Sequence, residues 1–119
     1  MQHSPGFVAL VESIRPLVTE VTLDELNAIT SVLLIDVRED HEWAQGRLPN
    51  AVHLGRGIIE RDIERLYPDT EQTIVLYCGG GHRSVMAAHH LNKMGYSQVK
   101  SLIGGYKGAI AAGLNVVTE

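Results

Sequence analysis

The feature that most constrains the fold is a short apolar run, 74–77, that leads directly into Cys78 and three glycines. Four consecutive apolar residues are typical of a strand that is buried on both faces. After Ser84, apolar residues recur at the three-residue spacing of a helix. Residues 73–88 therefore predict a strand, a tight loop and a helix, with a cysteine at the carboxyl end of the strand.

The predicted loop favours an anion at its centre, where the sulfur of Cys78 would lie. Gly79, Gly80 and Gly81 allow the backbone to curl so that several N–H groups point inward. The following helix adds the positive end of its dipole, and Arg83 adds a permanent charge. Such surroundings lower the pKa of a thiol from its usual value of about 8.5, so we expect a reactive thiolate. An inert, buried cysteine is the alternative, but it leaves the glycines and the arginine unexplained.

Cys78 is the single cysteine among 119 residues, a length that suits one domain with a proper core. An internal disulfide is excluded, and a catalytic cycle on Cys78 must pass its intermediate to an external acceptor. The formal net charge of −4 gives no electrostatic case for nucleic-acid binding. No apolar run is long enough to span a membrane, and the first residues lack the features of a signal peptide, so a cytoplasmic protein is expected.

The remaining chain alternates apolar runs with helical patterns, which predicts an α/β fold with a mostly parallel sheet. An N-terminal helical extension is expected over 1–19, packed on a domain over 20–119, with a dimerisation helix as the alternative. Thr22 and Glu25 match a capping box at the start of a short helix. The expected strands are 20–22, 32–35, 51–54, 74–77 and 98–102. The expected helices are 23–29, 40–45, 58–66, a helix from 84 to about 95, and 106–112.

Polar residues also follow two other predicted strands. Gly55, Arg56 and Gly57 follow strand 51–54 directly, and parallel strands would bring this loop to the same edge as Cys78. Arg56 is therefore a candidate second contact for an anionic substrate, with a solvated loop arginine as the alternative. Asp36 and Arg38 follow strand 32–35, so a catalytic role is one alternative. We interpret both as structural, either as an ion pair or as caps of loops.

Other kinds of site fit the sequence less well. The histidines lack the spacing of metal ligands, because His89 and His90 are adjacent and point about 100° apart on a helix. No metal and no cofactor are expected. The glycines are not followed by the Gly-Lys-Ser/Thr of a nucleotide P-loop, and they lack the spacing of a dinucleotide fingerprint. His82 has no partner in the sequence that would orient it as the base of a thiol protease.

Three segments resemble the single-domain rhodanese family, whose members are similar to thiosulfate sulfurtransferases. They are residues 34–51, the loop 78–84, and Gly104-Gly105-Tyr106. The family often has a glycine where this chain has Asn50. The resemblance covers roughly residues 20–114 and implies a three-layer α/β domain with a central five-stranded, mostly parallel sheet flanked by helices.

The resemblance also implies a double displacement. The Cys78 thiolate would take the outer sulfur of thiosulfate, or of a related persulfide donor, and give it to cyanide or a thiol, including a thiol on a protein. Gly79, Gly80, Gly81, His82 and Arg83 would contact the small anionic donor. Four residues separate Cys78 from Arg83, whereas related phosphatases have five, so the loop favours sulfur transfer. A sulfur carrier or redox-sensing binding module is the main alternative, and a phosphatase is the second.

Overall fold

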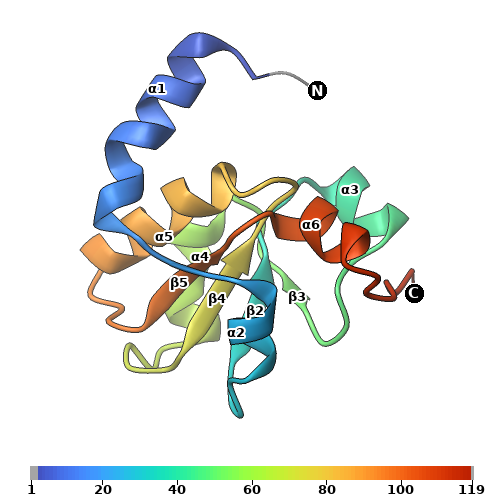
Figure 1. Ribbon diagram of the computed structural model, residues 1–119. Helices are drawn as coiled ribbons and strands as arrows, with labels where there is room; N and C mark the ends of the chain where they lie inside the picture. Colours follow the sequence, from blue (N-terminus) through green and yellow to red (C-terminus); the bar gives the residue numbers. More distant parts are fainter. Residues whose placement is uncertain (1–2, 119) are drawn as a thin grey trace.

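Figure 1 shows the computed structural model, which describes residues 3–118. Met1, Gln2 and Glu119, which belong to the predicted segments 1–19 and 20–119, lie outside the described residues. A central sheet is covered by helices on both faces, as the predicted α/β fold requires. Within residues 3–118, no helix combines the length and the apolar character that crossing a bilayer would need.

The sheet has five strands in the order β1-β5-β4-β2-β3, and every neighbouring pair is parallel. The strands are β1 (Thr19–Val21), β2 (Leu33–Asp36), β3 (Val52–His53), β4 (Ile74–Tyr77) and β5 (Val99–Leu102). All five predicted strands are confirmed, with small shifts at their ends. Strand β2 runs one residue further than predicted because Asp36 still pairs with His53 of β3 and Tyr77 of β4.

The helices occupy the predicted segments. They are α1 (Pro5–Ile14), followed by the short 3₁₀ helix η1 (Arg15–Leu17), α2 (Leu23–Asn27), α3 (Asp40–Gln45), α4 (Ile59–Leu66), α5 (Arg83–Lys93) and α6 (Gly105–Ala111). The predicted capping box is confirmed, since Glu25 N donates to Thr22 Oγ1 and Thr22 N donates to Glu25 Oε1. Helix α2 nevertheless ends two residues earlier than predicted.

The side chains of β4 divide the core into two layers, because successive residues of a strand face opposite sides. Ile74 and Leu76 pack toward α4 and α5, whereas Val75 and Tyr77 pack toward α2 and α6. All four side chains are fully buried, which explains why the run is apolar throughout. Each apolar side chain buried in this way stabilises the fold by about 1.5–3 kcal/mol.

Helix α1 packs on the outer side of α5, beside it in Figure 1. Val11 is fully buried against Val85 and Met86, and Phe7 and Ile14 are partly buried in the same cluster. The expected packing of the N-terminal helix on the body of the domain is therefore present. It also brings the beginning of the described chain close to the N-terminal end of α5.

A turn at Asn50 uses the left-handed backbone region, with a φ of 67°. Glycine and asparagine adopt this conformation more readily than other residues, so Asn50 suits the position where the related family often has glycine. Near the end of the chain, Arg47 and Val117 form an antiparallel bridge. Leu114 packs against the α2 and α6 side of the core, so this part of the chain lies against the body of the domain.

Strand order decides which loops meet at the carboxyl edge of the sheet. The neighbours of β4 are β2 and β5, so the segments that follow these two strands flank the Cys78 loop. The loop that contains Arg56 follows β3, and β2 lies between β3 and β4. Parallel pairing thus brings Arg56 to the same edge as Cys78, but two strands away.

Candidate active site

The sulfur of Cys78 lies in a cradle of hydrogen-bond donors at the start of α5. Gly81 N donates to Sγ at 3.2 Å and Ser84 N donates at 3.4 Å. Gly81 has a φ of 97°, and any residue with a side chain would be strained in this conformation. Cys78 is only 1% exposed, so the thiol sits at the bottom of the loop with its donors already in place.

Two serine hydroxyls extend this cradle into the protein. Ser84 Oγ lies 3.4 Å from Cys78 Sγ, and it forms a 2.7 Å hydrogen bond with Ser101 Oγ on β5. Both serines are fully buried. This pair was not predicted from the sequence, because the two hydroxyls come from different elements and neither residue stands out alone. Together they form a buried polar contact next to the sulfur.

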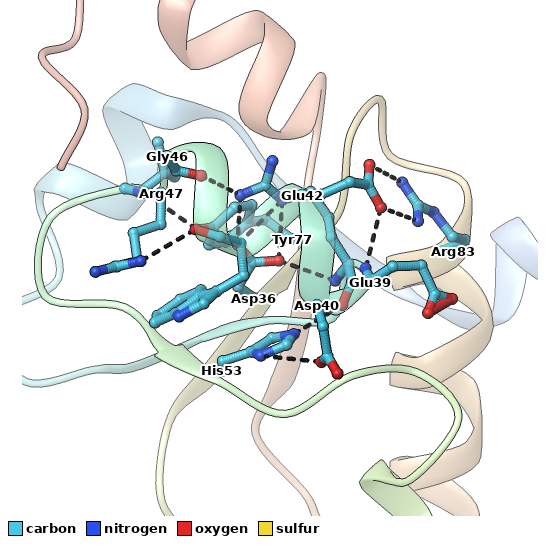
Figure 2. A network of polar contacts seen from close by, with 12 residues as sticks. Asp36, Glu39, Asp40, Glu42, Gly46, Arg47, His53, Tyr77 and Arg83 are labelled. Atoms are coloured by element: carbon cyan, nitrogen blue, oxygen red, sulfur yellow. Dashed lines mark hydrogen bonds and ion pairs between the residues drawn. The ribbon is translucent and has the colours of Figure 1, made fainter. Parts of the chain in front are cut away.

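Arg83 is held by Glu42 of α3 through a two-point ion pair, shown in Figure 2. Its Nη1 lies 2.8 Å from Oε1, and its Nη2 lies 3.1 Å from Oε2. This contact lowers the pKa of Glu42 to about 2 and raises the pKa of Arg83. Glu42 also accepts a hydrogen bond from Glu39 N at the start of α3. Arg83 therefore ties the loop to α3 while its charge is largely compensated.

The backbone of α6 fixes the other side of the loop. Tyr106 N donates to Cys78 O at 2.8 Å, and Lys107 N donates to Gly79 O at 3.0 Å. Gly105 has a φ of 55°, and a Cβ atom at this position would collide with Cys78 O and the backbone of Gly79. Gly105 thus allows the chain to approach the cysteine loop closely.

A cavity of about 340 Å³ opens over the sulfur. Its lining includes five of the predicted site residues, namely Cys78, Gly79, Gly80, His82 and Arg83. Gly81 contributes its N–H to the sulfur.

Arg56 is not among the lining residues of this cavity. Its backbone N–H bonds to Val37 O, and its charge acts on Glu60 of α4. The strand order, which places β2 between β3 and β4, accounts for this separation.

Three lining residues were not predicted from the sequence: His3, Glu42 and Lys107. Glu42 follows β2 and Lys107 follows β5, the two neighbours of β4. His3 reaches the cavity because α1 packs along α5. Each of these positions depends on contacts between distant segments, and a local sequence pattern carries no signal of them.

His82, within the cysteine loop, packs against the N-terminal segment. Its ring centroid is 4.5 Å from that of His3 and 5.9 Å from that of Phe7. Burial lowers the pKa of His82, and the nearby charges of His3 and Arg15 lower it further. His82 Nδ1 is buried and has no hydrogen-bond partner among residues 3–118. The ring is therefore neutral at neutral pH and forms part of the cavity wall.

Asp36 and Arg38 form the predicted structural ion pair, and Arg38 also contacts the end of α3. Arg38 Nη2 lies 2.7 Å from Asp36 Oδ2 and donates to Gly46 O at 2.6 Å, at the end of α3. The guanidinium also stacks over Tyr106, 4.0 Å from the ring centroid. Over the described residues, no group of three or more histidine, cysteine, aspartate or glutamate side chains is arranged to hold a metal ion.

The sequence similarity to known proteins covers most of the chain. The family model of the rhodanese-like domain matches residues 19–112. A putative sulfurtransferase of Bacillus subtilis, YtwF, is 35% identical over 72% of this chain and 82% of its own. The thiosulfate sulfurtransferase GlpE of Coxiella burnetii is 31% identical over 70% of this chain and 76% of its own. A putative sulfur carrier protein of B. subtilis, YrkF, is 30% identical over 80% of this chain and 50% of its own.

Solved structures extend the similarity to the fold. A Rhodopseudomonas palustris protein, described as of unknown function and a possible tyrosine phosphatase, superimposes with a TM-score of 0.84 over 98% of both chains, at 23% identity. The human single-domain sulfurtransferase TSTD1 has a TM-score of 0.72 and 25% identity over 77% of this chain and 95% of its own. The family match and these shared folds agree with the strand order and the cysteine loop described above, and the chain belongs to the rhodanese-like domain family.

Proposed function

We propose that this protein is a sulfurtransferase that carries a sulfane sulfur on Cys78 as a persulfide. The observation that carries the proposal is the cradle of Gly81 N–H and Ser84 N–H around Cys78 Sγ, at the bottom of an open cavity. Relatives named sulfurtransferase and the rhodanese fold support a role of this kind. The donor is thiosulfate or a related persulfide, and the acceptor is cyanide or a thiol.

In the first step, the Cys78 thiolate attacks the outer sulfur of thiosulfate. A bond forms between Cys78 Sγ and that sulfur while the S–S bond of thiosulfate breaks, and sulfite leaves with the electron pair of the broken bond. Gly79, Gly80, His82 and Arg83 line the cavity in which the donor would lie. The loop donors are in place before the reaction, so they stabilise a negatively charged sulfur without having to reorganise.

In the second step, the acceptor attacks the outer sulfur of the persulfide. The bond to Cys78 Sγ breaks, its electron pair returns to Sγ as the thiolate, and the product is thiocyanate or an acceptor persulfide. No second cysteine is needed, and the chain contains none. The backbone donors can serve in both steps because the thiolate and the persulfide are both anions.

The geometry favours sulfur transfer over phosphatase chemistry. Four residues separate Cys78 from Arg83, and Arg83 points to Glu42, which occupies its guanidinium at two points. A phosphatase needs that guanidinium and a wider loop to hold a tetrahedral oxyanion. Hydrolysis of an aryl phosphate that disappears in Cys78→Ser would contradict the proposal.

Intact mass spectrometry provides the direct test. The wild-type protein is incubated with thiosulfate, freed of excess donor and weighed. We expect a gain of one sulfur atom that cyanide removes with formation of thiocyanate, and no gain in Cys78→Ser. Equal sulfur uptake or equal thiocyanate formation in the two proteins would refute the proposal. A loaded wild type that forms thiocyanate only very slowly, yet passes its sulfur to a protein thiol, would favour the carrier function.

A further inference from the structure

A second cavity of about 310 Å³ adjoins the one over Cys78. The two cavities share Glu42, Gly79 and Lys107, and the second continues past them to Gln45, Tyr106 and Ile110. A donor as compact as thiosulfate would fit within the first cavity alone, which leaves the second cavity unfilled by such a donor. The second cavity suits a longer molecule whose reactive end lies over Cys78.

The charges around this shared wall leave one cation uncompensated. Glu42 is neutralised by Arg83, and the buried Arg38 is neutralised by Asp36. Lys107 is exposed and forms no ion pair with any of the residues that the structure describes. The ammonium group of Lys107 is therefore the unpaired positive charge where the two cavities meet.

The backbone of Lys107 has a fixed position relative to the nucleophile. Lys107 N donates to Gly79 O, and Tyr106 N donates to Cys78 O, so the first turn of α6 is hydrogen-bonded to the cysteine loop. Beyond Lys107, the wall offers the amide of Gln45, the ring of Tyr106 and the half-exposed side chain of Ile110. This surface combines an anion contact with apolar area for a short carbon chain.

We propose that the second cavity binds the distal part of a thiol acceptor that carries a carboxylate, and that Lys107 contacts this carboxylate. The inference rests on the proposed sulfur transfer and names the class of acceptor for it. The acceptor thiolate forms a bond to the outer sulfur of the Cys78 persulfide as the bond to Sγ breaks. The electron pair of that bond returns to Cys78, and the acceptor leaves as a persulfide, so the transfer needs no oxidant or reductant.

The test isolates the discharge step. Wild type, Lys107→Met and Lys107→Glu are loaded with sulfur, freed of donor, and mixed with matched pairs of thiols. Each pair has the same chain length and ends in a carboxylate or a hydroxyl: 3-mercaptopropionate with 3-mercaptopropanol, and 6-mercaptohexanoate with 6-mercaptohexanol. Loss of the extra sulfur is followed by mass spectrometry. Comparison of variant with wild type for each thiol removes differences in intrinsic thiol reactivity.

We expect Lys107→Met to slow discharge by the carboxylates about twofold to fivefold, the range of one exposed ion pair, and to leave the alcohols unchanged. Lys107→Glu should slow the carboxylates further, and high salt should remove the difference. Lys93→Met, which removes an exposed lysine at the end of α5, is the matched control and should behave as wild type. Equal effects on both members of each pair, or no effect, would overturn the acceptor site. A wild-type chain that takes up no sulfur would overturn the proposed function itself, and the acceptor site with it.

Discussion

Arg83 and Glu42 lie 41 residues apart in the sequence, yet their side chains meet at two points, 2.8 and 3.1 Å apart. The contact joins the first residue of α5 to the middle of α3, and so connects the segments that follow β4 and β2. Both side chains also line the cavity over Cys78. The same pair therefore supports the loop and contributes charged groups to the wall of the cavity.

Replacement of Glu42 by glutamine is expected to lower the free energy of unfolding by about 1 kcal/mol at neutral pH. The pKa of Glu42 is about 2 in the folded protein, compared with an ordinary value of 4.5. The stabilising contribution of the carboxylate is thus complete above pH 4.5 and is lost as the pH falls toward 2. Urea unfolding of wild type and Glu42→Gln at several pH values should give curves that converge in acid. Glu64→Gln, at an exposed position on α4, is the control, and a constant difference at all pH values would contradict the prediction.

Arg83 can act on the donor through its charge or only by holding the loop, and two variants separate these roles. Arg83→Ala is expected to raise the KM for thiosulfate about tenfold or more, the size of one charge-assisted hydrogen bond. Glu42→Gln leaves Arg83 charged and frees it, so it should lower this KM or leave it unchanged. Steady-state assays of thiocyanate formation measure the KM for thiosulfate in both variants. An equal rise in KM in the two variants would show that Arg83 serves only to hold the loop.

The buried hydroxyl pair of Ser84 and Ser101 predicts a strong coupling between two substitutions. Ser84→Ala removes a contact to Cys78 Sγ and leaves the Ser101 hydroxyl without a partner, which should cost about 1–3 kcal/mol of stability. Adding Ser101→Ala should restore part of this loss, because the orphaned hydroxyl is then gone. A double-mutant cycle from urea unfolding measures the coupling. Strictly additive losses would mean that the two hydroxyls do not depend on each other.

A side chain at Gly105 should disrupt the cysteine loop. Gly105→Ala places a Cβ atom against Cys78 O and Gly79, at a φ of 55° that disfavours any side chain. We expect a loss of about 2 kcal/mol or more in unfolding free energy, together with slower sulfur uptake. Gly57→Ala is the control, because no atom lies within 4 Å of the added Cβ and its φ is not in the left-handed region. Equal stability of the two variants would contradict the close approach of α6.

His3 is expected to hold down the pKa of His82. Burial is the larger cause of the lowered value, and the charge of His3 is the next. In His3→Ala, the pKa of His82 should therefore rise toward its ordinary value of 6.5, as seen in an NMR titration of the imidazole protons. The unfolded chain binds a proton at His82 more readily than the folded protein does, so the free energy of unfolding falls as the pH drops below 6.5. His3→Ala should lose less of this free energy than wild type. His41→Ala, at an exposed position, should leave the titration of His82 unchanged.

Local sequence patterns were sufficient for most of the fold. Helix α3 and strand β4 were predicted with their observed bounds, since acidic residues and Gly46 delimit the helix and Cys78 ends the apolar run. The end of β2 was placed one residue short, because the burial of Asp36 depends on its ion pair with Arg38. The local sequence does not show whether a polar residue at the end of a strand has a partner that would allow it to be buried.

The candidate site was predictable only where it is continuous in sequence. The loop that begins at Cys78 is recognisable in the sequence by its glycines and its arginine. Glu42 lies on α3 after β2, Ser101 lies on β5, and Lys107 lies on α6 after β5. The order of these strands in the sheet cannot be predicted from their individual sequence patterns. Arg56 was predicted as a candidate second contact for an anionic substrate because the strand order was not known from the sequence. In the structure, β2 lies between the strand that precedes the Arg56 loop and β4.

The hydrogen bonds from Tyr106 N to Cys78 O and from Lys107 N to Gly79 O involve main-chain atoms alone. These two bonds therefore do not depend on the exposed side chains of α6, whereas Tyr106 and Ala109 pack against the core. Residues such as Lys107 and Ile110 can be exchanged while the sulfur keeps its place. Under the proposed acceptor site, substitutions at these exposed positions would change which acceptor is preferred, while the main-chain bonds keep the cysteine loop in place.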